Sequence, residues 1–200
     1  MAIYNIRHCE TYGNKHNKFG GDSEVLLTIK GIDQAKSLGY RLLDEKQDFT
    51  KYRFISSPKM RTQHTLQIIM EILGVEYTNI IEIEPLIKTK YKGYLENMTK
   101  EEAKIKYKKE LEEREKDPWN WCYPGGGESF ASEYERIMKF LDKYKDVKDM
   151  VFVGHQGVCS VIAEILSGKT KEEIMNNRMN LKFNQNHCFV KYDDGSYKYL

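Results

Sequence analysis

The chain has 200 residues, a formal net charge of +2 and four cysteines. A chain of this length buries a core without disulfides or a metal, and its near-neutral charge gives no general attraction for nucleic acid or membrane surfaces. No apolar run reaches the roughly 20 residues of a membrane-spanning helix, and the start of the chain lacks the pattern of a signal peptide. The cysteines form no C-x-x-C pair, so we expect reduced thiols in a cytoplasmic protein.

The first predicted strand ends at an arginine and a histidine. Residues 2–6 form a short apolar run, and Arg7-His8-Cys9-Glu10-Thr11 follows it directly. Open α/β sheets bind ligands at the C-terminal ends of their strands. A guanidinium can hold phosphate oxygens in a planar fork, and an imidazole can attack phosphorus. This pair therefore predicts chemistry on a phosphate group.

A second arginine follows the next predicted strand. Residues 28–45 have a helical stripe of apolar side chains, and residues 53–56 form the strand. The sequence predicts a helix over 58–73, with Ser57 as its N-cap and Pro58 as its first residue. Arg61 then lies in the first turns of this helix, near the end of the strand.

Residues from about 85 to 128 interrupt the alternation of strands and helices after a predicted strand at 79–83. Thr99 and Glu102 form a capping box that opens a helix reaching about Lys116. Its seven basic and seven acidic residues between Lys100 and Asp117 favour a solvated helix over a binding surface. An aromatic loop rich in proline and glycine follows, and it suits a wall or lid over a site.

The last third of the chain returns to the alternating pattern. Helices are predicted at 129–144 and 157–166, around a strand at 150–154 that ends just before His155 and Gln156. A hairpin is predicted from 187–192 and 196–199, joined by a turn at Asp194-Gly195. The pattern predicts a three-layer α/β fold with a largely parallel central sheet flanked by helices. We expect one domain over 1–200, with the insertion at about 85–128 lying over the site.

These motifs resemble those of the histidine phosphatase superfamily, which includes phosphoglycerate mutase. The first motif, with Asn14 three residues further on, is similar to the family pattern R-H-G-E-[ST]-x-x-N. The other matching segments are Leu27-Thr28 with Gly31, Ser56-Ser57-Pro58 with Arg61, Gly127-Glu128-Ser129 and Gly154-His155.

The resemblance implies a role for each matching residue. His8 would take the phosphoryl group, while Arg7, Arg61 and His155 would hold its oxygens. Positive neighbours lower the pKa of an imidazole and so keep it neutral for attack. The same positive charges stabilise the transferring phosphoryl group without a metal. The residues implied to contact the phosphate or substrate are Thr11, Asn14, Gly20, Gly21 and Gln156.

The expected activity is hydrolysis of a small phosphorylated metabolite through a phosphohistidine, with no metal, no cofactor and no nucleic-acid or membrane partner. Two alternatives stay open: a phosphoglycerate mutase, and a catalytically weakened phosphate-binding regulatory protein on the same fold.

The chain departs from the family pattern at two places. Cys9 stands where the family has glycine, and we interpret it as a small buried residue. Lys88 or Thr89 stands where the family has its acidic proton donor, depending on how the segment is counted. The nearest carboxylic acids that could replace that donor are Glu84 and Glu96.

The missing acid changes the expected substrates. General acid catalysis contributes roughly 10²–10⁴-fold to a rate, and its loss matters least when the leaving group is already acidic. Lys88, Lys90 and Lys92 alternate along this segment. They either face the pocket, where they would favour a substrate with extra negative charge, or face solvent.

Overall fold

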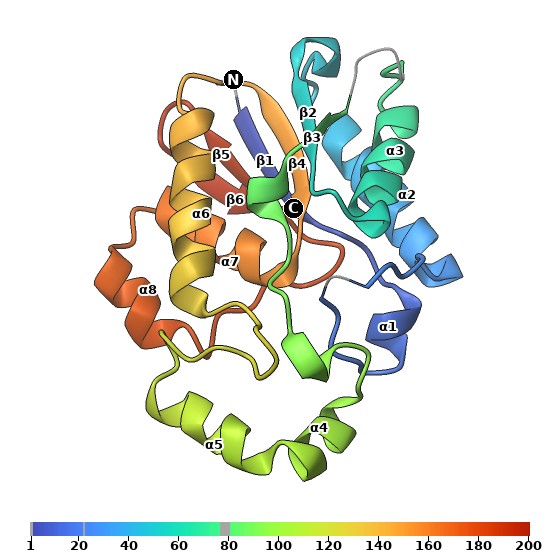
Figure 1. Cartoon of the computed structure of the whole chain (residues 1–200). Coiled ribbons are helices and arrows are strands. Elements are labelled where there is room, and N and C mark those ends of the chain that lie inside the picture. The colour runs from blue at the N-terminus through green and yellow to red at the C-terminus, as the bar shows by residue number, and fades with distance from the viewer. Residues whose placement is uncertain (1, 22, 77–80) are drawn as a thin grey trace.

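The computed structural model describes residues 2–21, 23–76 and 81–200. Within these ranges six strands form one sheet in the order β3-β2-β4-β1-β5-β6 (Figure 1). The pairs among β1, β2, β3 and β4 are parallel, whereas β5 and β6 are antiparallel to their neighbours. The strands are β1 (Ala2–Arg7), β2 (Arg53–Ser56), β3 (Glu82–Ile83), β4 (Met150–Gly154), β5 (Cys188–Tyr192) and β6 (Tyr197–Tyr199).

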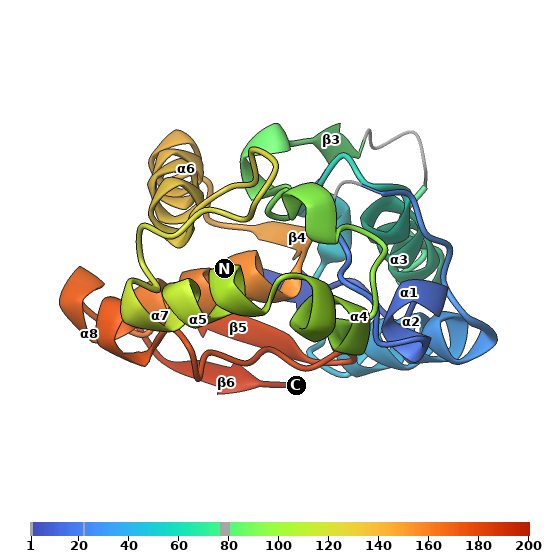
Figure 2. The same ribbon diagram turned by 60° about the horizontal axis from the view of Figure 1, so that its bottom comes forward.

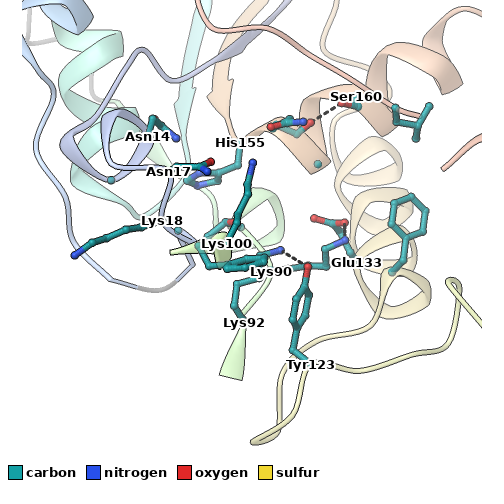
Figure 3. Close-up of a pocket in the computed structure, with 18 of the residues that line it drawn as sticks. Asn14, Asn17, Lys18, Lys90, Lys92, Lys100, Tyr123, Glu133, His155 and Ser160 are labelled. Carbon is teal, nitrogen blue, oxygen red and sulfur yellow. Dashed lines mark hydrogen bonds and ion pairs between the residues drawn. The ribbon is translucent and has the colours of Figure 1, made fainter. Parts of the chain in front are cut away.

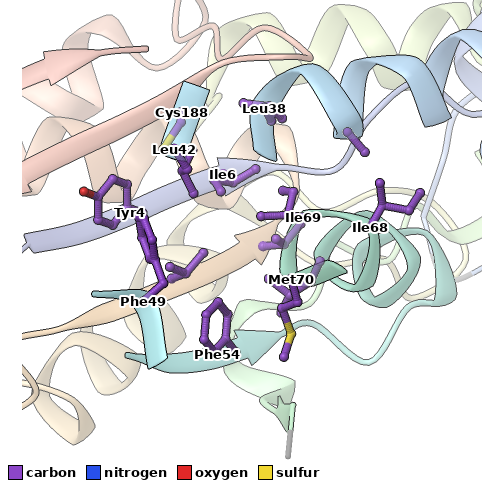
Figure 4. Packing of buried hydrophobic residues seen from close by; sticks show 14 of the residues in the cluster. Tyr4, Ile6, Leu38, Leu42, Phe49, Phe54, Ile68, Ile69, Met70 and Cys188 are labelled. Carbon is purple, nitrogen blue, oxygen red and sulfur yellow. The ribbon is translucent and has the colours of Figure 1, made fainter. Parts of the chain in front are cut away.

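Helices cover both faces of the sheet, as Figures 1 and 2 show. Side chains of α2 and α3 pack with Tyr4 and Ile6 on one face, in the core drawn in Figure 4. Side chains of α6 and α7 pack with Met150 and Phe152 on the other. This arrangement confirms the predicted three-layer α/β fold with its largely parallel sheet. The helices that flank the sheet are α2 (Ile29–Leu43), α3 (Met60–Ile72), α6 (Phe130–Lys143) and α7 (Gln156–Leu166).

The strand register brings three chain segments to one edge of the sheet. Arg7 pairs with Gly154, and Ser56 pairs with Val153. The pairing continues for one residue beyond the strands: His8 N donates to Gly154 O at 3.0 Å, and Ser57 N donates to Val153 O at 3.1 Å. The residues that follow β1, β2 and β4 therefore leave the sheet side by side.

The helix after β2 begins later than predicted. α3 starts at Met60, and its N-cap residue Lys59 makes no side-chain capping bond. The prediction of Ser57 as N-cap is wrong, because the Ser57 hydroxyl is hydrogen-bonded to His155 instead. Arg61 is the second residue of the helix and so lies in its first turn, which confirms the predicted placement.

The insertion has two short helices where one was predicted. The capping box of Thr99 and Glu102 opens α4 (Lys100–Lys106) as expected, but Tyr107 interrupts the helix before α5 (Lys108–Lys116). Both helices lie beyond the C-terminal ends of the parallel strands (Figure 2). The same segment contains the 3-10 helices η2 (Pro85–Ile87) and η3 (Gly93–Leu95).

Other short elements complete the chain. The predicted C-terminal hairpin is confirmed by the pairing of β5 with β6, and Gly195 in its turn has a positive φ of 86°. β3 supplies the last two residues of the strand predicted at 79–83, whereas residues 79 and 80 lie outside the described ranges. The remaining elements are α1 (Tyr12–Lys15), η1 (Phe49–Lys51) and α8 (Lys171–Asn177). None of the helices in the described part of the chain is long and apolar enough to cross a membrane.

Candidate active site

A pocket of about 970 Å³ opens at the edge where β1, β2 and β4 end. The pair Arg7 and His8, together with Arg61 and His155, comes from three distant segments of the chain, and all four residues line the pocket. The insertion supplies the facing wall. Figure 3 shows Lys90, Lys92 and Lys100 from this wall around the same space as His155.

His8 is held in a form that suits nucleophilic attack. Its ring is buried, and Nδ1 lies 2.8 Å from the carbonyl oxygen of Cys9. Because a carbonyl oxygen only accepts hydrogen bonds, Nδ1 carries the proton and Nε2 keeps its lone pair. Burial, and then the charges of Arg61 and Arg7, hold the pKa of His8 well below its ordinary value. His8 is therefore neutral at physiological pH.

His155 lies beside His8 in the pocket lining. The two ring centroids are 5.2 Å apart, with the rings edge to face. His155 Nε2 and Ser57 Oγ are hydrogen-bonded at 2.8 Å, which fixes the orientation of the imidazole. Burial, and then the nearby charge of Arg61, lower the pKa of His155 well below its usual range. Ser57, which does not itself line the pocket, therefore positions the His155 ring.

The two arginines supply positive charge beside the imidazoles. Arg61 donates to the carbonyl oxygens of Gly21 and Ser23, both at 2.9 Å, which ties the helix to the loop after α1. Arg7 donates from Nη1 to Phe183 O at 2.7 Å, but its Nε is buried and has no hydrogen-bond partner among the described residues. Burial lowers the pKa of Arg7 to about 10, so it stays cationic near neutral pH. The pocket is built for an anion.

Comparison with known proteins places this geometry in a family. Residues 3–200 match the histidine phosphatase superfamily (branch 1). The chain belongs to this superfamily. It is 29% identical over 178 residues to the adenosylcobalamin/alpha-ribazole phosphatase of Salmonella typhimurium, covering 84% of this chain and 80% of that protein.

Two further relatives show how widely the fold is used. The chain is 27% identical to 6-phosphofructo-2-kinase/fructose-2,6-bisphosphatase 1 of Homo sapiens, matching over 86% of this chain but only 34% of that longer protein. The crystal structure of the alpha-ribazole phosphatase of Shigella flexneri superposes with a TM-score of 0.79 at 23% identity, covering 99% of this chain and 94% of that one. These relatives are therefore named for different substrates. Which substrate this chain binds depends on the side chains of its own pocket.

Four of the five predicted substrate-contact residues line the pocket of this histidine phosphatase. They are Thr11, Asn14, Gly20 and Gln156. Asn14 Oδ1 accepts hydrogen bonds from Thr11 and, at 2.6 Å, from Gln185 Nε2, which holds the amide in place. Gly21 is not among the lining residues, and its backbone contributes by accepting from Arg61.

The two carboxylates considered as replacement proton donors lie outside the pocket lining. Glu84 is buried in a separate cluster, where it accepts from Lys143 Nζ at 2.6 Å and Tyr144 Oη at 3.0 Å. Glu96 lies against Gly21 and accepts from Lys92 N at 3.2 Å. The structure therefore does not support Glu84 or Glu96 as the proton donor.

A different carboxylate, Glu133, lines the pocket. It is 1% exposed, and it pairs with Lys90 Nζ at 2.7 Å. Gly157, two residues after His155, packs against this carboxylate: a Cβ atom at Gly157 would lie 2.9 Å from Glu133 Oε1. The ion pair therefore lies next to the edge of the sheet that carries His155. Although burial alone would raise the pKa of Glu133, the charges of Lys90 and Arg136 lower it, so the carboxylate is ionised.

The lysine segment and the charged helices face the pocket in part. Thr89, Lys90 and Lys92 line it, whereas Lys88 does not. In α4 and α5, one face contributes Lys100, Lys104, Lys108 and Arg114. These three lysines are exposed to solvent, as predicted for a solvated helix, and they also line the pocket. A Lys100, Lys104, Lys108 stripe at intervals of four residues was the available signal.

Cys9 belongs to the hydrophobic core of the protein. Cys9 is fully buried, and burial raises the pKa of its thiol to about 12, so it is an unreactive packing residue as interpreted from the sequence. Within the described ranges, no group of three or more His, Cys, Asp or Glu side chains is arranged to hold a metal ion.

Proposed function

We propose that this chain is a phosphatase that hydrolyses small-molecule phosphate monoesters in two steps through a phosphohistidine at His8. The observation that carries the proposal is the buried His8 ring, whose Nδ1 is hydrogen-bonded to Cys9 O and which lines the pocket together with Arg7, Arg61 and His155. This bond leaves Nε2 as the nitrogen with a free lone pair for attack on phosphorus. The phosphatase names of the relatives support a hydrolase over a binding protein.

The first step forms the phosphohistidine. The Nε2 lone pair of His8 forms a bond to phosphorus while the ester P–O bond breaks, and its electron pair stays with the leaving oxygen. Arg7 and Arg61 balance the charge on the phosphoryl oxygens, and neutral His155 contributes a hydrogen bond. In the second step, water attacks phosphorus, the N–P bond breaks, and orthophosphate leaves a neutral His8.

The leaving oxygen must receive a proton unless it is already acidic. Of the two residues that stand in for the family's acid, Lys88 and Thr89, only Thr89 lines the pocket. Its hydroxyl is too weak an acid to replace a carboxyl. Glu133 is held ionised by its cationic neighbours and has no proton to give. The chain is therefore suited to substrates whose leaving group is already acidic, such as a phenol, a carboxylic acid or another phosphate.

The direct test is release of phosphate with EDTA present. We expect p-nitrophenyl phosphate to be hydrolysed at least about 100-fold faster than β-glycerophosphate, because only the second needs its leaving group protonated. Steady-state kinetics between pH 5 and 8 would measure both rates.

The other outcomes separate the alternatives. Equal rates would show that a proton donor is present. Phosphate binding without any turnover would favour a regulatory protein. Isomerisation of 3-phosphoglycerate in the presence of a bisphosphate primer, faster than its hydrolysis, would favour a mutase.

A carboxylate at position 89 should restore the missing acid. Thr89→Glu is expected to raise kcat/KM for β-glycerophosphate by about 10-fold or more, with no comparable gain for p-nitrophenyl phosphate. Lys88→Glu is the matched control, because Lys88 is adjacent in the chain but does not line the pocket. A gain from Lys88→Glu, or none from Thr89→Glu, would contradict the assignment of position 89.

A further inference from the structure

The second step of the proposed reaction needs a proton acceptor, whereas the first needs a donor. When water attacks the phosphohistidine, its oxygen must lose a proton, and the leaving oxygen of the first step must gain one. A carboxylate that is already ionised suits only the second task. Positions 88 and 89, one of which carries the acid in the family, hold a lysine and a threonine here. Any carboxylate acceptor in this pocket therefore comes from another part of the chain.

Glu133 is the one buried carboxylate among the described residues that line the pocket. The other two, Glu112 and Glu115, are exposed on α5. Glu133 lies on α6, outside the insertion, and is 1% exposed. The Lys90 ammonium at 2.7 Å and the Arg136 guanidinium at 3.8 Å balance its charge. Burial alone would raise the pKa of Glu133, but these charges lower it, so the carboxylate is ionised.

The Glu133 carboxylate lies against the turn that carries His155. Gly157 is in the first turn of α7, and His155 is the N-cap of this helix. A Cβ atom at Gly157 would lie 2.9 Å from Glu133 Oε1 and 3.3 Å from Oε2. A side chain at position 157 would therefore displace the carboxylate, whereas glycine leaves this close approach open. Figure 3 shows Glu133 and His155 lining the same space.

The groups around Glu133 leave it as the proton acceptor. The ionisable side chains that act on it are Lys90 and Lys92 from the insertion, Arg136 on α6, Cys159 on α7 and Arg178 after α8. Burial raises the pKa of the Cys159 thiol, so the thiol is uncharged, and the other four groups are cations. In the second step His8 carries the phosphoryl group, and His155 Nε2 is engaged with Ser57. The carboxylate is thus the base that remains.

We propose that Glu133 is the general base of the second step: its carboxylate orients the attacking water and accepts a proton from it. This role rests on the proposed function and adds a catalytic residue to it. The water oxygen forms the new bond to phosphorus, its proton moves to Glu133, and the electron pair of the N–P bond returns to His8 Nε2. The proton then leaves with orthophosphate, which restores the carboxylate. Because Glu133 has no proton during the first step, that step still needs an acidic leaving group.

Separate rates for the two steps test this role. Glu133→Gln alone leaves the Lys90 ammonium unpaired, so Lys90→Met is compared with the double variant Lys90→Met/Glu133→Gln. Lys90→Met keeps the carboxylate, with Arg136 as its neighbouring cation. Stopped-flow release of p-nitrophenol from p-nitrophenyl phosphate measures the first step, and rapid quenching with labelled substrate measures decay of the phosphoenzyme. We expect similar first steps, but decay at least about 100-fold slower in the double variant, which therefore accumulates phosphoenzyme.

Glu135→Gln is the matched control. Glu135 is exposed on the same helix and does not line the pocket, so the substitution removes an equal charge from α6 without changing the site. Both rates should keep their wild-type values in this variant. Thermal melting would confirm that each protein is folded.

The pH dependence of phosphoenzyme decay gives a second readout, which a purely structural role would not change. Burial raises the pKa of Glu133, and Lys90 is the largest influence that lowers it, so Lys90→Met raises that pKa. The carboxylate accepts a proton only while it is ionised. On acidification, decay in Lys90→Met should therefore begin to slow at a higher pH than in the wild-type protein. The double variant should lack this dependence, because an amide does not titrate.

The outcomes distinguish this role from the proposed function. Equal decay rates in Lys90→Met and the double variant, or an equal slowing of both steps in a folded double variant, would overturn the role of Glu133 while leaving the phosphatase intact. A wild-type protein that releases no p-nitrophenol would overturn the proposed function, and the role of Glu133 with it.

Discussion

Replacing His8 by alanine is expected to lower kcat for p-nitrophenyl phosphate by at least about 10⁴-fold, because no other group can accept the phosphoryl group. His155, the nearest imidazole, has its Nε2 engaged with Ser57 at 2.8 Å and is not placed to replace it. Phosphate-release assays would measure the rate. Quenching with labelled substrate would test whether the acid-labile phosphoenzyme disappears as well.

The control for this variant is a histidine outside the pocket. His64 is exposed on α3, the helix that also carries Arg61, and His64→Ala should keep full activity. Far-ultraviolet circular dichroism should show both variants folded. Substantial turnover in a folded His8→Ala protein, or a phosphoenzyme that survives the substitution, would contradict the assignment of the nucleophile.

The convergence of the site residues could be predicted from the sequence because it depends on the ends of strands. Arg7 and His155 each stand at the end of an apolar run, and parallel strands end at the same edge of a sheet. The register then determines the side-by-side placement that the structure shows for Arg7 and Gly154. Local sequence was sufficient here, since each residue is positioned by its own strand.

Partners chosen by tertiary packing could not be predicted in this way. A serine before a proline fits an N-cap, yet the Ser57 hydroxyl bonds His155, 98 residues away. Tyr107 interrupts the charged helix although no proline or glycine stands nearby in the sequence. The capping box of Thr170 and Glu173 opens α8, however, with the same pattern as that of Thr99 and Glu102, so this helix could have been found.

The sequence also contains a signal that points to Glu133. It lies three residues after Phe130 and four before Ile137, on the face of α6 that is buried. A carboxylate on the apolar face of an amphipathic helix requires a charged partner or a function. The partner, Lys90, lies in the insertion, and only the fold brings the two together.

Breaking this buried pair should cost the protein more stability than any substitution on its surface. Glu133→Gln is expected to lower the free energy of unfolding by about 3–5 kcal/mol at pH 7, because it leaves the Lys90 ammonium without its carboxylate. The two side chains are only 2% and 13% exposed, so solvent cannot compensate for the loss. Chemical denaturation would measure the difference.

Two further measurements test whether the unpaired Lys90 ammonium causes this destabilisation: its dependence on pH, and the effect of a second substitution. Burial already lowers the pKa of Lys90, and Glu133 is the largest influence that raises it, so Glu133→Gln lowers that pKa further. The destabilisation should then diminish toward pH 9, as Lys90 loses its proton and no longer buries a charge. Adding Lys90→Met to Glu133→Gln should recover most of the lost stability at pH 7, since the double variant contains no unpaired ammonium. A loss that is independent of pH and unchanged in the double variant would mean that Glu133 stabilises the fold through packing, and that the ion pair with Lys90 contributes little.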